Sequence, residues 1–182
     1  MKNRNLNYEL IEQCKKGNSK AQFEIYKLYS KAMYNTSLRI IKDEAEAEDI
    51  IQESFLIAFK NINTLSGELS FGAWLKKIVI NKSLDFLKKR KIEFENIENI
   101  KLIDKEEDEE NTKNETLELK VNKIKDAIMK LPDGYRIILS LYLLEGYDHN
   151  EISEILDISA SSSRSQLARA KTKLIKLLTN NN

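Results

Sequence analysis

The chain has 182 residues, of which 41% are hydrophobic and 32% charged, and its net charge is +1. Five Gly and one Pro are too few for the turns of an all-β protein, so we expect an all-α protein of one domain or two small ones. Its one cysteine, Cys14, cannot form an internal disulfide, which excludes a secreted disulfide-rich scaffold. The N-terminal residues resemble no signal peptide and no apolar run reaches the roughly 18 residues of a membrane helix, so we expect a cytoplasmic protein without direct membrane insertion.

The charge is unevenly distributed along the chain. Residues 1–90 carry 16 basic and 11 acidic side chains (+5), residues 91–120 carry 5 and 11 (−6), and residues 121–182 carry 9 and 7 (+2). Two basic blocks separated by an acidic one indicate a nucleic-acid partner more strongly than the total charge does.

Residues 1–91 are predicted to form an N-terminal helical domain. Gly17 ends a short opening helix, and Asn18 or Ser19 caps the second helix. The third helix starts near Asp43 and has acidic residues in its first turn, where the helix dipole favours them.

A fourth helix is predicted over about residues 70–89, after a polar loop that begins near Asn63. Its cluster of basic residues suits single-stranded or melted nucleic acid. Trp74 offers a platform on which a base can stack, but its helical spacing with Phe71 and Ile78 favours a place in the core.

Residues 92–115 lack helical periodicity, and the stretch 104–111 is almost entirely polar. Such a segment buries too little apolar surface to offset the entropy lost on ordering. We therefore predict a flexible acidic linker, with a solvated extension of the preceding helix as the alternative.

Residues 116–182 are predicted to form a C-terminal domain of four helices. The second begins at Pro132, a favoured first helical position, and stops at Gly146. Asp148 caps a short third helix, and Glu151 completes a capping box.

The third and fourth helices of this block have helix-turn-helix proportions. In that motif the second helix enters the major groove, and its N-terminal residues meet base edges. From Ala160 onward the chain has five basic residues and no acidic ones, as phosphate contact requires. The candidate base-reading residues are Ser161, Ser162, Arg164, Ser165 and Gln166. The alternative is a solvated basic face.

Four segments resemble motifs of the sigma factors of bacterial RNA polymerase. They are AEDIIQESF at 47–55, FGAWLKKIVINK at 71–82, LPDGYR at 131–136 and LYLLEGYDHNEI at 141–152. The first looks like the acidic helix of those factors, the second like their promoter-melting helix, and the last two like the start of their C-terminal domain. With its short length and missing middle domain, the chain is similar to the extracytoplasmic-function (ECF) group.

The resemblance implies that the chain binds promoter DNA and the clamp helices in the largest subunit of bacterial core RNA polymerase, with an anti-sigma factor as a further partner. The linker would then thread near the polymerase active cleft. The implied polymerase-binding residues are Asp49, Gln52 and Glu53. The residues implied to bind the melted −10 element are Asn63, Phe71, Lys77, Asn81, Lys82 and Lys88. The residues implied to bind the −35 duplex are Ser161, Ser162, Arg164, Ser165, Gln166, Arg169 and Lys173.

The chain departs from the family pattern in the fourth C-terminal helix, where Ser163 replaces an apolar residue and Gln166 a basic one. A stand-alone helix-turn-helix regulator is the alternative function, although it explains only the C-terminal block. An enzyme is not expected, because the sequence has no Cys/His metal set, glycine-rich phosphate loop or nucleophile elbow, and the lone His149 is predicted on the surface. We expect no catalytic residue, metal or cofactor.

Overall fold

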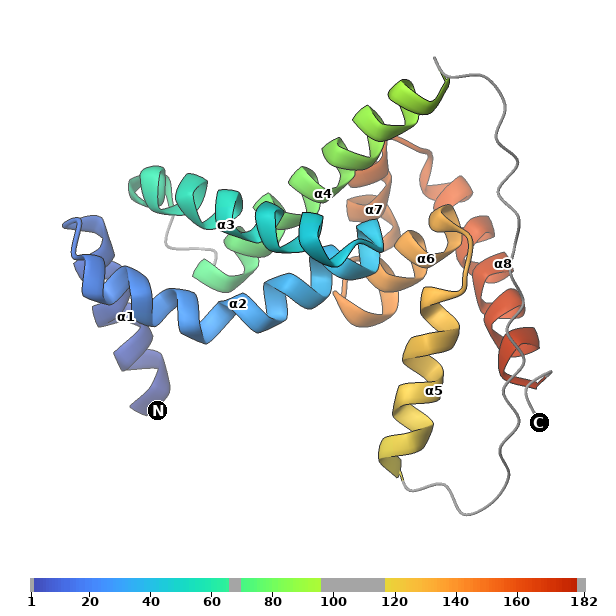
Figure 1. Ribbon diagram of the computed structural model, residues 1–182, viewed down its shortest axis with the longest axis horizontal. Coiled ribbons are helices and arrows are strands. Elements are labelled where there is room, and N and C mark those ends of the chain that lie inside the picture. The colour runs from blue at the N-terminus through green and yellow to red at the C-terminus, as the bar shows by residue number, and fades with distance from the viewer. Residues whose placement is uncertain (1, 66–69, 96–116, 180–182) are drawn as a thin grey trace. The chain divides into compact units, whose positions relative to one another are not determined.

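The computed structural model describes residues 2–65, 70–95 and 117–179, and none of them lies in a β-strand (Figure 1). The helices form two compact units, Met1–Lys91 and Ile92–Asn182. The predicted all-α fold is therefore confirmed. Among the described residues, no helix has both the length and the apolar character needed to cross a bilayer.

The described residues of the first unit form four α-helices and one short 3-10 helix. They are α1 (Lys2–Lys15), α2 (Ser19–Ile41), α3 (Glu44–Lys60), η1 (Ile62–Thr64) and α4 (Phe71–Glu95). Asn18 caps α2 by accepting hydrogen bonds from the backbone N–H groups of Lys20 and Ala21, and Asp43 caps α3 by accepting from that of Glu46. Asn18 is one of the two predicted caps of the second helix, and the third helix starts next to Asp43, as predicted.

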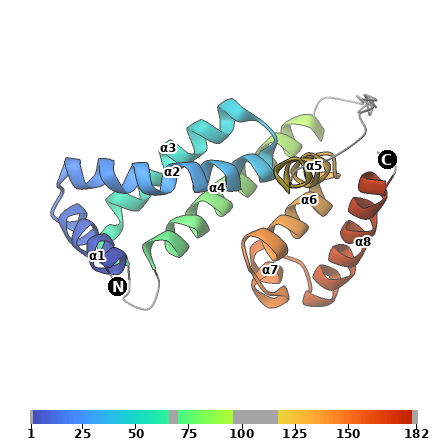
Figure 2. The same ribbon diagram turned by 90° about the horizontal axis from the view of Figure 1, so that it is seen from below.

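The core of this unit is formed where α2, α3 and α4 meet. Ile25, Leu75 and Val79 are completely buried, and the ring of Tyr26 packs against that of Phe55 with centroids 4.8 Å apart. The α2 and α3 helices lie side by side in both views (Figures 1 and 2). Trp74 is half-buried and packs against this core, as its spacing predicted.

A pair of buried serines joins α2 to α4. The Oγ atoms of Ser37 and Ser83 are 2.9 Å apart, and both residues are 0% exposed. Because the Ser83 hydroxyl donates to the carbonyl of Val79 at 2.8 Å, the proton between the two serines comes from Ser37. Each buried hydroxyl therefore has a partner, as burial of a polar group requires.

The α4 helix extends to Glu95, beyond its predicted end near residue 89. Residues 92–95, which the sequence assigned to the linker, are therefore helical. The rest of the predicted linker, residues 96–115, lies outside the described residues.

Between residues 117 and 179, the described part of the second unit, the chain forms four α-helices and a π-helical turn. They are α5 (Leu117–Met129), α6 (Asp133–Leu139), η2 (Ser140–Leu144, the π-helical turn), α7 (His149–Leu156) and α8 (Ala160–Thr179). Its most buried side chains include Ile138, Leu141, Ile152 and Ala170, which come from α6, η2, α7 and α8. Gly146 has φ +82°, a conformation that favours glycine, and it lies between η2 and α7.

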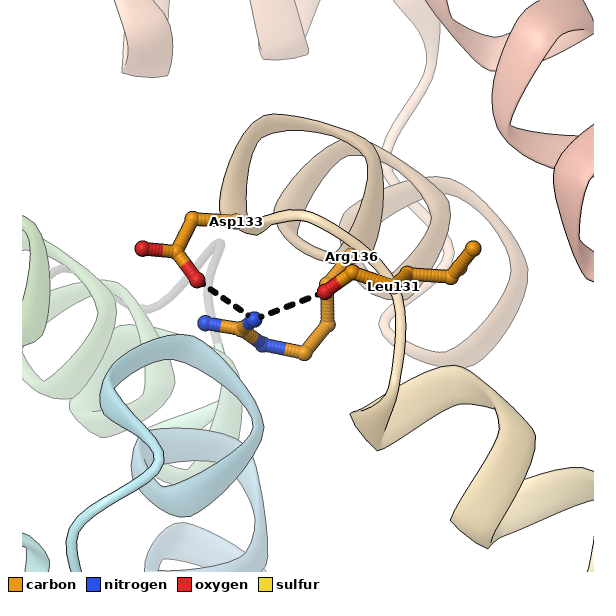
Figure 3. A network of polar contacts seen from close by, with 3 residues as sticks. All are labelled: Leu131, Asp133 and Arg136. Atoms are coloured by element: carbon orange, nitrogen blue, oxygen red, sulfur yellow. Dashed lines mark hydrogen bonds and ion pairs between the residues drawn. The ribbon is translucent and has the colours of Figure 1, made fainter. Parts of the chain in front are cut away.

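The start of α6 differs from its prediction. Pro132 is the residue before the helix and supplies no side-chain cap, so it is not the first helical residue. Instead, the side chain of Arg136 forms hydrogen bonds with residues at the start of α6. Its Nη1 donates to the carbonyl of Leu131 at 3.2 Å and to Oδ1 of Asp133 at 2.7 Å (Figure 3).

We predict that Ser83→Ala lowers the free energy of unfolding of the first unit by about 1–3 kcal/mol, because the Ser37 hydroxyl then loses its acceptor in the core. The double variant Ser37→Ala/Ser83→Ala should cost less than the sum of the two single variants. Urea unfolding followed by fluorescence of Trp74, the one tryptophan of the chain, measures this. Additive losses in the double variant would contradict it, and the exposed Ser19→Ala is the control.

Candidate nucleic-acid interface

The helix-turn-helix is built by α7, a tight turn and α8. The Asp148 carboxylate accepts from the backbone N–H groups of Asn150 (2.7 Å) and Glu151 (2.9 Å), and the Glu151 carboxylate accepts from the backbone N–H of Asp148 (2.8 Å). This is the predicted capping box. The turn contains Asp157 at φ +54°, and the Ser159 hydroxyl then accepts from the backbone N–H of Ser162 in the first turn of α8.

The outer face of α8 is polar and basic. Its exposed residues include Ser161, Arg164, Ser165, Arg169 and Lys173, all of which the sequence singled out. The opposite face is buried through Ser163, Leu167 and Ala170. A helix with a buried stripe and a basic outer stripe that lacks acidic residues can approach the phosphates of a duplex without like-charge repulsion.

Two other predicted base-reading residues on α8 bind each other. The Gln166 side-chain Nε2 donates to the Ser162 Oγ at 3.0 Å, and both residues are half-buried. The amide of Gln166 is therefore held against its own helix, and a base contact by Gln166 requires that it exchange this bond.

Side-chain contacts join α7 and α8 to each other and to η2. Ser163 is 0% exposed, and its Oγ is 2.9 Å from Nδ1 of His149. The His149 ring stacks on Tyr142 at 4.8 Å, and the Lys171 Nζ lies 5.5 Å from the centre of the Tyr142 ring. His149, predicted on the surface, is half-buried because these contacts cover its ring.

A second basic face lies on α4. Lys77, Asn81 and Lys88 are exposed, and their spacing of four and seven residues places them on one stripe of the helix. Asn63 is exposed in η1. Phe71 is wrongly assigned to the DNA-binding residues, because its ring is 2% exposed and packs against Tyr29 and Trp74 in the core.

Lys82 does not share the outer stripe of α4. Its Nζ forms a 2.7 Å ion pair with Oε2 of Glu53 on α3. The hydrogen bond from Lys82, followed by its positive charge, lowers the pKa of the Glu53 carboxyl below its ordinary value. The sequence assigned the two side chains to different surfaces, and the structure brings them together.

The exposed face of α3 carries the predicted polymerase-binding residues, Asp49, Gln52 and Glu53. Leu56 lies one turn beyond Gln52 on the same face and is 70% exposed. Leu56 was not among the predicted residues, although an apolar residue outside the buried stripe of an amphipathic helix was a signal available in the sequence. An open groove runs beside this face, between α2 and α3, and is lined by Tyr26, Ser30, Lys31, Tyr34, Glu48, Ile51 and Gln52.

The described part of the chain shows neither a metal site nor a reactive thiol. Those residues contain no group of three or more His, Cys, Asp or Glu side chains able to hold a metal ion. Cys14 is buried, and desolvation raises the pKa of its thiol, which disfavours the reactive thiolate.

The helix-turn-helix with its basic outer face defines a DNA-binding protein, and comparison with known proteins identifies the kind. Residues 25–92 match the family described as Sigma-70 region 2, and residues 122–174 match Sigma-70, region 4. The ECF RNA polymerase sigma factor SigW of Bacillus subtilis is 30% identical over 177 residues, which cover 92% of this chain and 94% of SigW. The ECF RNA polymerase sigma-E factor of Haemophilus influenzae is 28% identical over 170 residues, which cover 89% of each chain.

Solved structures agree in fold. A chain from the structure of CnrH in complex with the cytosolic domain of CnrY has a TM-score of 0.57 at 21% identity, over 95% of this chain and 97% of that one. A chain from the structure of the sigma factor RpoE with the anti-sigma factor NepR from Bartonella quintana has a TM-score of 0.61 at 19% identity, over 87% and 97%. The chain belongs to the ECF family of sigma-70-like factors, and its function is that of an RNA polymerase sigma factor. Sigma factors are initiation factors rather than enzymes.

We predict that Lys82→Gln raises the pKa of Glu53 toward its ordinary value of about 4.5. In the folded protein that pKa is lowered, so the ion pair stabilises the fold above the unfolded-state pKa and loses this effect as the pH falls through the folded-state pKa. The effect on stability is small, about 0–1 kcal/mol, because both side chains are partly exposed. NMR titration of the Glu53 carboxyl measures the change, with Lys77→Gln as the control, and an unaltered titration in Lys82→Gln would rule the pair out as its cause.

Proposed function

We propose that the two units divide promoter recognition between them, with residues 1–91 binding core polymerase and the −10 element and residues 116–182 binding the −35 element. Residues 92–115 would join the two. The observation that carries this proposal is that one chain presents three separate exposed faces, which are acidic on α3 and basic on α4 and α8. A stand-alone DNA-binding regulator has no use for the acidic face or for the second basic face.

For the −35 element, the proposed contacts come from the outer face of α8. Arg164 can bind guanine bidentately in the major groove, while Arg169 and Lys173 are spaced to follow the phosphates. Ser161 and Ser165 flank Arg164 on the same exposed face and can donate to a base edge or a phosphate. Ser162 and Gln166 take part after their mutual hydrogen bond is exchanged.

For the −10 element, the proposed contacts come from Asn63 and from the outer stripe of α4, where Lys77, Asn81 and Lys88 are exposed. Basic and amide side chains on one stripe can follow a single strand whose bases have left the stack. Lys82 takes a secondary part, because its charge is paired with Glu53.

For the polymerase, the proposed surface is the exposed face of α3 with Asp49, Gln52, Glu53 and Leu56, together with the neighbouring groove. An apolar side chain among acidic and amide groups is typical of a docking surface, where burial of the apolar group adds affinity and the charges set orientation. The partner would be the clamp helices of the largest polymerase subunit.

We also propose that an anti-sigma factor binds the chain and competes with the polymerase. This is supported by the structure of RpoE with the anti-sigma factor NepR, to which the fold is similar. The chain would act in the bacterial cytoplasm by binding alone, with no catalytic step of its own. Each DNA-binding face is small, so the polymerase would make the two contacts additive by holding them at a fixed spacing.

Transcription in vitro tests the function as a whole. Purified chain is mixed with bacterial core polymerase and fragmented genomic DNA, and transcript 5′ ends are sequenced. Discrete, factor-dependent starts that share two upstream elements at a fixed spacing are expected. A folded chain that yields no such starts, beside a control factor that does, would reject promoter recognition of this kind.

In that assay, Arg164→Ala is expected to lower promoter-specific transcription about fivefold to a hundredfold, the range that loss of one bidentate base contact predicts. Core polymerase binding should not change, because Arg164 belongs to α8 of the second unit, whereas the proposed polymerase-binding face belongs to α3 of the first unit. Co-purification with core polymerase is measured alongside. Transcription at the wild-type level would remove Arg164 from the reading residues.

Substitution of the α3 face tests the polymerase surface separately. Asp49→Lys and Leu56→Ser are each expected to weaken binding to core polymerase by about tenfold or more while helix content is retained. Asp49 is a better target than Glu53, whose reversal would also place a cation beside Lys82.

The matched control is Leu28→Ser on α2. Leu28 is 56% exposed, and at about 100° per residue it lies about 160° around α2 from Tyr26 and Ser30 in the groove. Affinity for core polymerase, measured by competition with a labelled factor, should fall for the α3 variants alone. An equal loss for Leu28→Ser would mean that the α3 face is not the specific surface.

A further inference from the structure

The contact between His149 and Ser163 joins the two helices of the helix-turn-helix, and none of the proposed binding faces uses it. His149 is the first residue of α7, and Ser163 lies in the first turn of α8 between Ser162 and Arg164. The Nδ1 and Oγ atoms are 2.9 Å apart, and Ser163 is 0% exposed. Solvent therefore does not reach Ser163 to take over this bond.

The His149 ring is also held from its other side. It stacks on Tyr142 of η2 with centroids 4.8 Å apart and the planes at 26°. The Lys171 Nζ lies 5.5 Å from the centre of the same Tyr142 ring. Ser163 and Lys171 are eight residues apart, about 12 Å along α8 at 1.5 Å per residue. Ser163 and Lys171, at two separate points on α8, therefore both contact the stacked pair of Tyr142 and His149.

Two attached points fix both the direction of a helix and its rotation about its own axis. Base-reading side chains have to be held to within about 0.5 Å and 10–20° of their working geometry. A hydrogen bond is directional, whereas an apolar contact of the kind the family often has at position 163 permits a range of rotations. The bond at Ser163 therefore limits how far α8 can turn.

We propose that His149 is a positioning residue for promoter recognition. By holding Ser163 it sets the rotation of α8, and so the direction in which Arg164 faces the bases. This rests on the proposed reading of the −35 element by α8. His149 itself touches no base in this proposal.

Three variants separate positioning from stability. His149→Phe keeps an aromatic ring on Tyr142 but removes the bond to Ser163. His149→Asn places an amide atom close to the position of Nδ1 and serves as the conservative rescue. His149→Phe/Ser163→Ala removes both partners, so that no buried hydroxyl is left without one.

Polymerase holoenzyme made with each variant is assayed on a factor-dependent promoter and on versions substituted at single −35 positions, and thermal unfolding is measured in parallel. His149→Phe should reduce the preference for the native −35 element about fivefold or more, the discrimination that one base contact supplies. His149→Asn should restore it. The double variant should regain thermal stability while its preference stays low.

Two results would overturn this inference. If the preference returns in the double variant together with its stability, the pair is only structural; if His149→Phe keeps the full preference, the bond does not position α8. Arg164→Ala is run in the same assay, so that a failure of this inference can be distinguished from a failure of the proposed reading of the −35 element. Loss of preference in Arg164→Ala with none in His149→Phe rejects the inference alone, whereas no loss in Arg164→Ala rejects it together with the proposed reading of the −35 element by α8.

Discussion

Each of the two small units has to bury its apolar side chains between a few helices. This constraint determines which faces of the helices are left for charged side chains. On α3 the buried stripe leaves one free face, which carries Asp49, Gln52 and Glu53. On α8 it leaves the face with Arg164 and Arg169. Because packing fixes the core side of each helix, it also determines which side of the helix is left for binding.

Polar bonds between helices add the directional precision that apolar packing lacks. Ser37 and Ser83 join α2 to α4, and His149 and Ser163 join α7 to α8, each across a contact of 2.9 Å. In both cases the buried serine hydroxyl has a hydrogen-bond partner, which avoids the free-energy cost of burying an unsatisfied polar group.

Features that depend on neighbours along the chain could be predicted from the sequence. The cap of α2 at Asn18, one of the two residues predicted for it, and the capping box at Asp148 were predicted correctly, because capping acts over three or four residues. The end of α4 was not, because charged residues near position 90 are equally compatible with a solvated helix.

Pairings between distant residues could not be predicted in this way. Lys82 and Glu53 are 29 positions apart, and only the packing of α3 against α4 brings them together. For Phe71, helical spacing predicted a place in the core and the family resemblance implied a DNA contact, and the structure packs its ring against Tyr29 and Trp74. Whether a basic side chain such as Lys82 forms an ion pair depends on how the helices of the unit pack. The contacts with DNA and polymerase are proposals, which experiment has to test.

The ion pair of Lys82 with Glu53 has a consequence for ionic strength. A cation that displaces a condensed counterion from a nucleic acid adds about 0.7 to the salt dependence of binding to a single strand. The charge of Lys82 is already compensated by the Glu53 carboxylate. A contact between Lys82 and a nucleic acid would therefore displace few counterions. Added salt would weaken the ion pair and the strand contact together, so the two effects at this position oppose each other. Any steep salt dependence of the α4 face would therefore arise from its outer cations such as Lys77 and Lys88, which form no ion pair among the described residues.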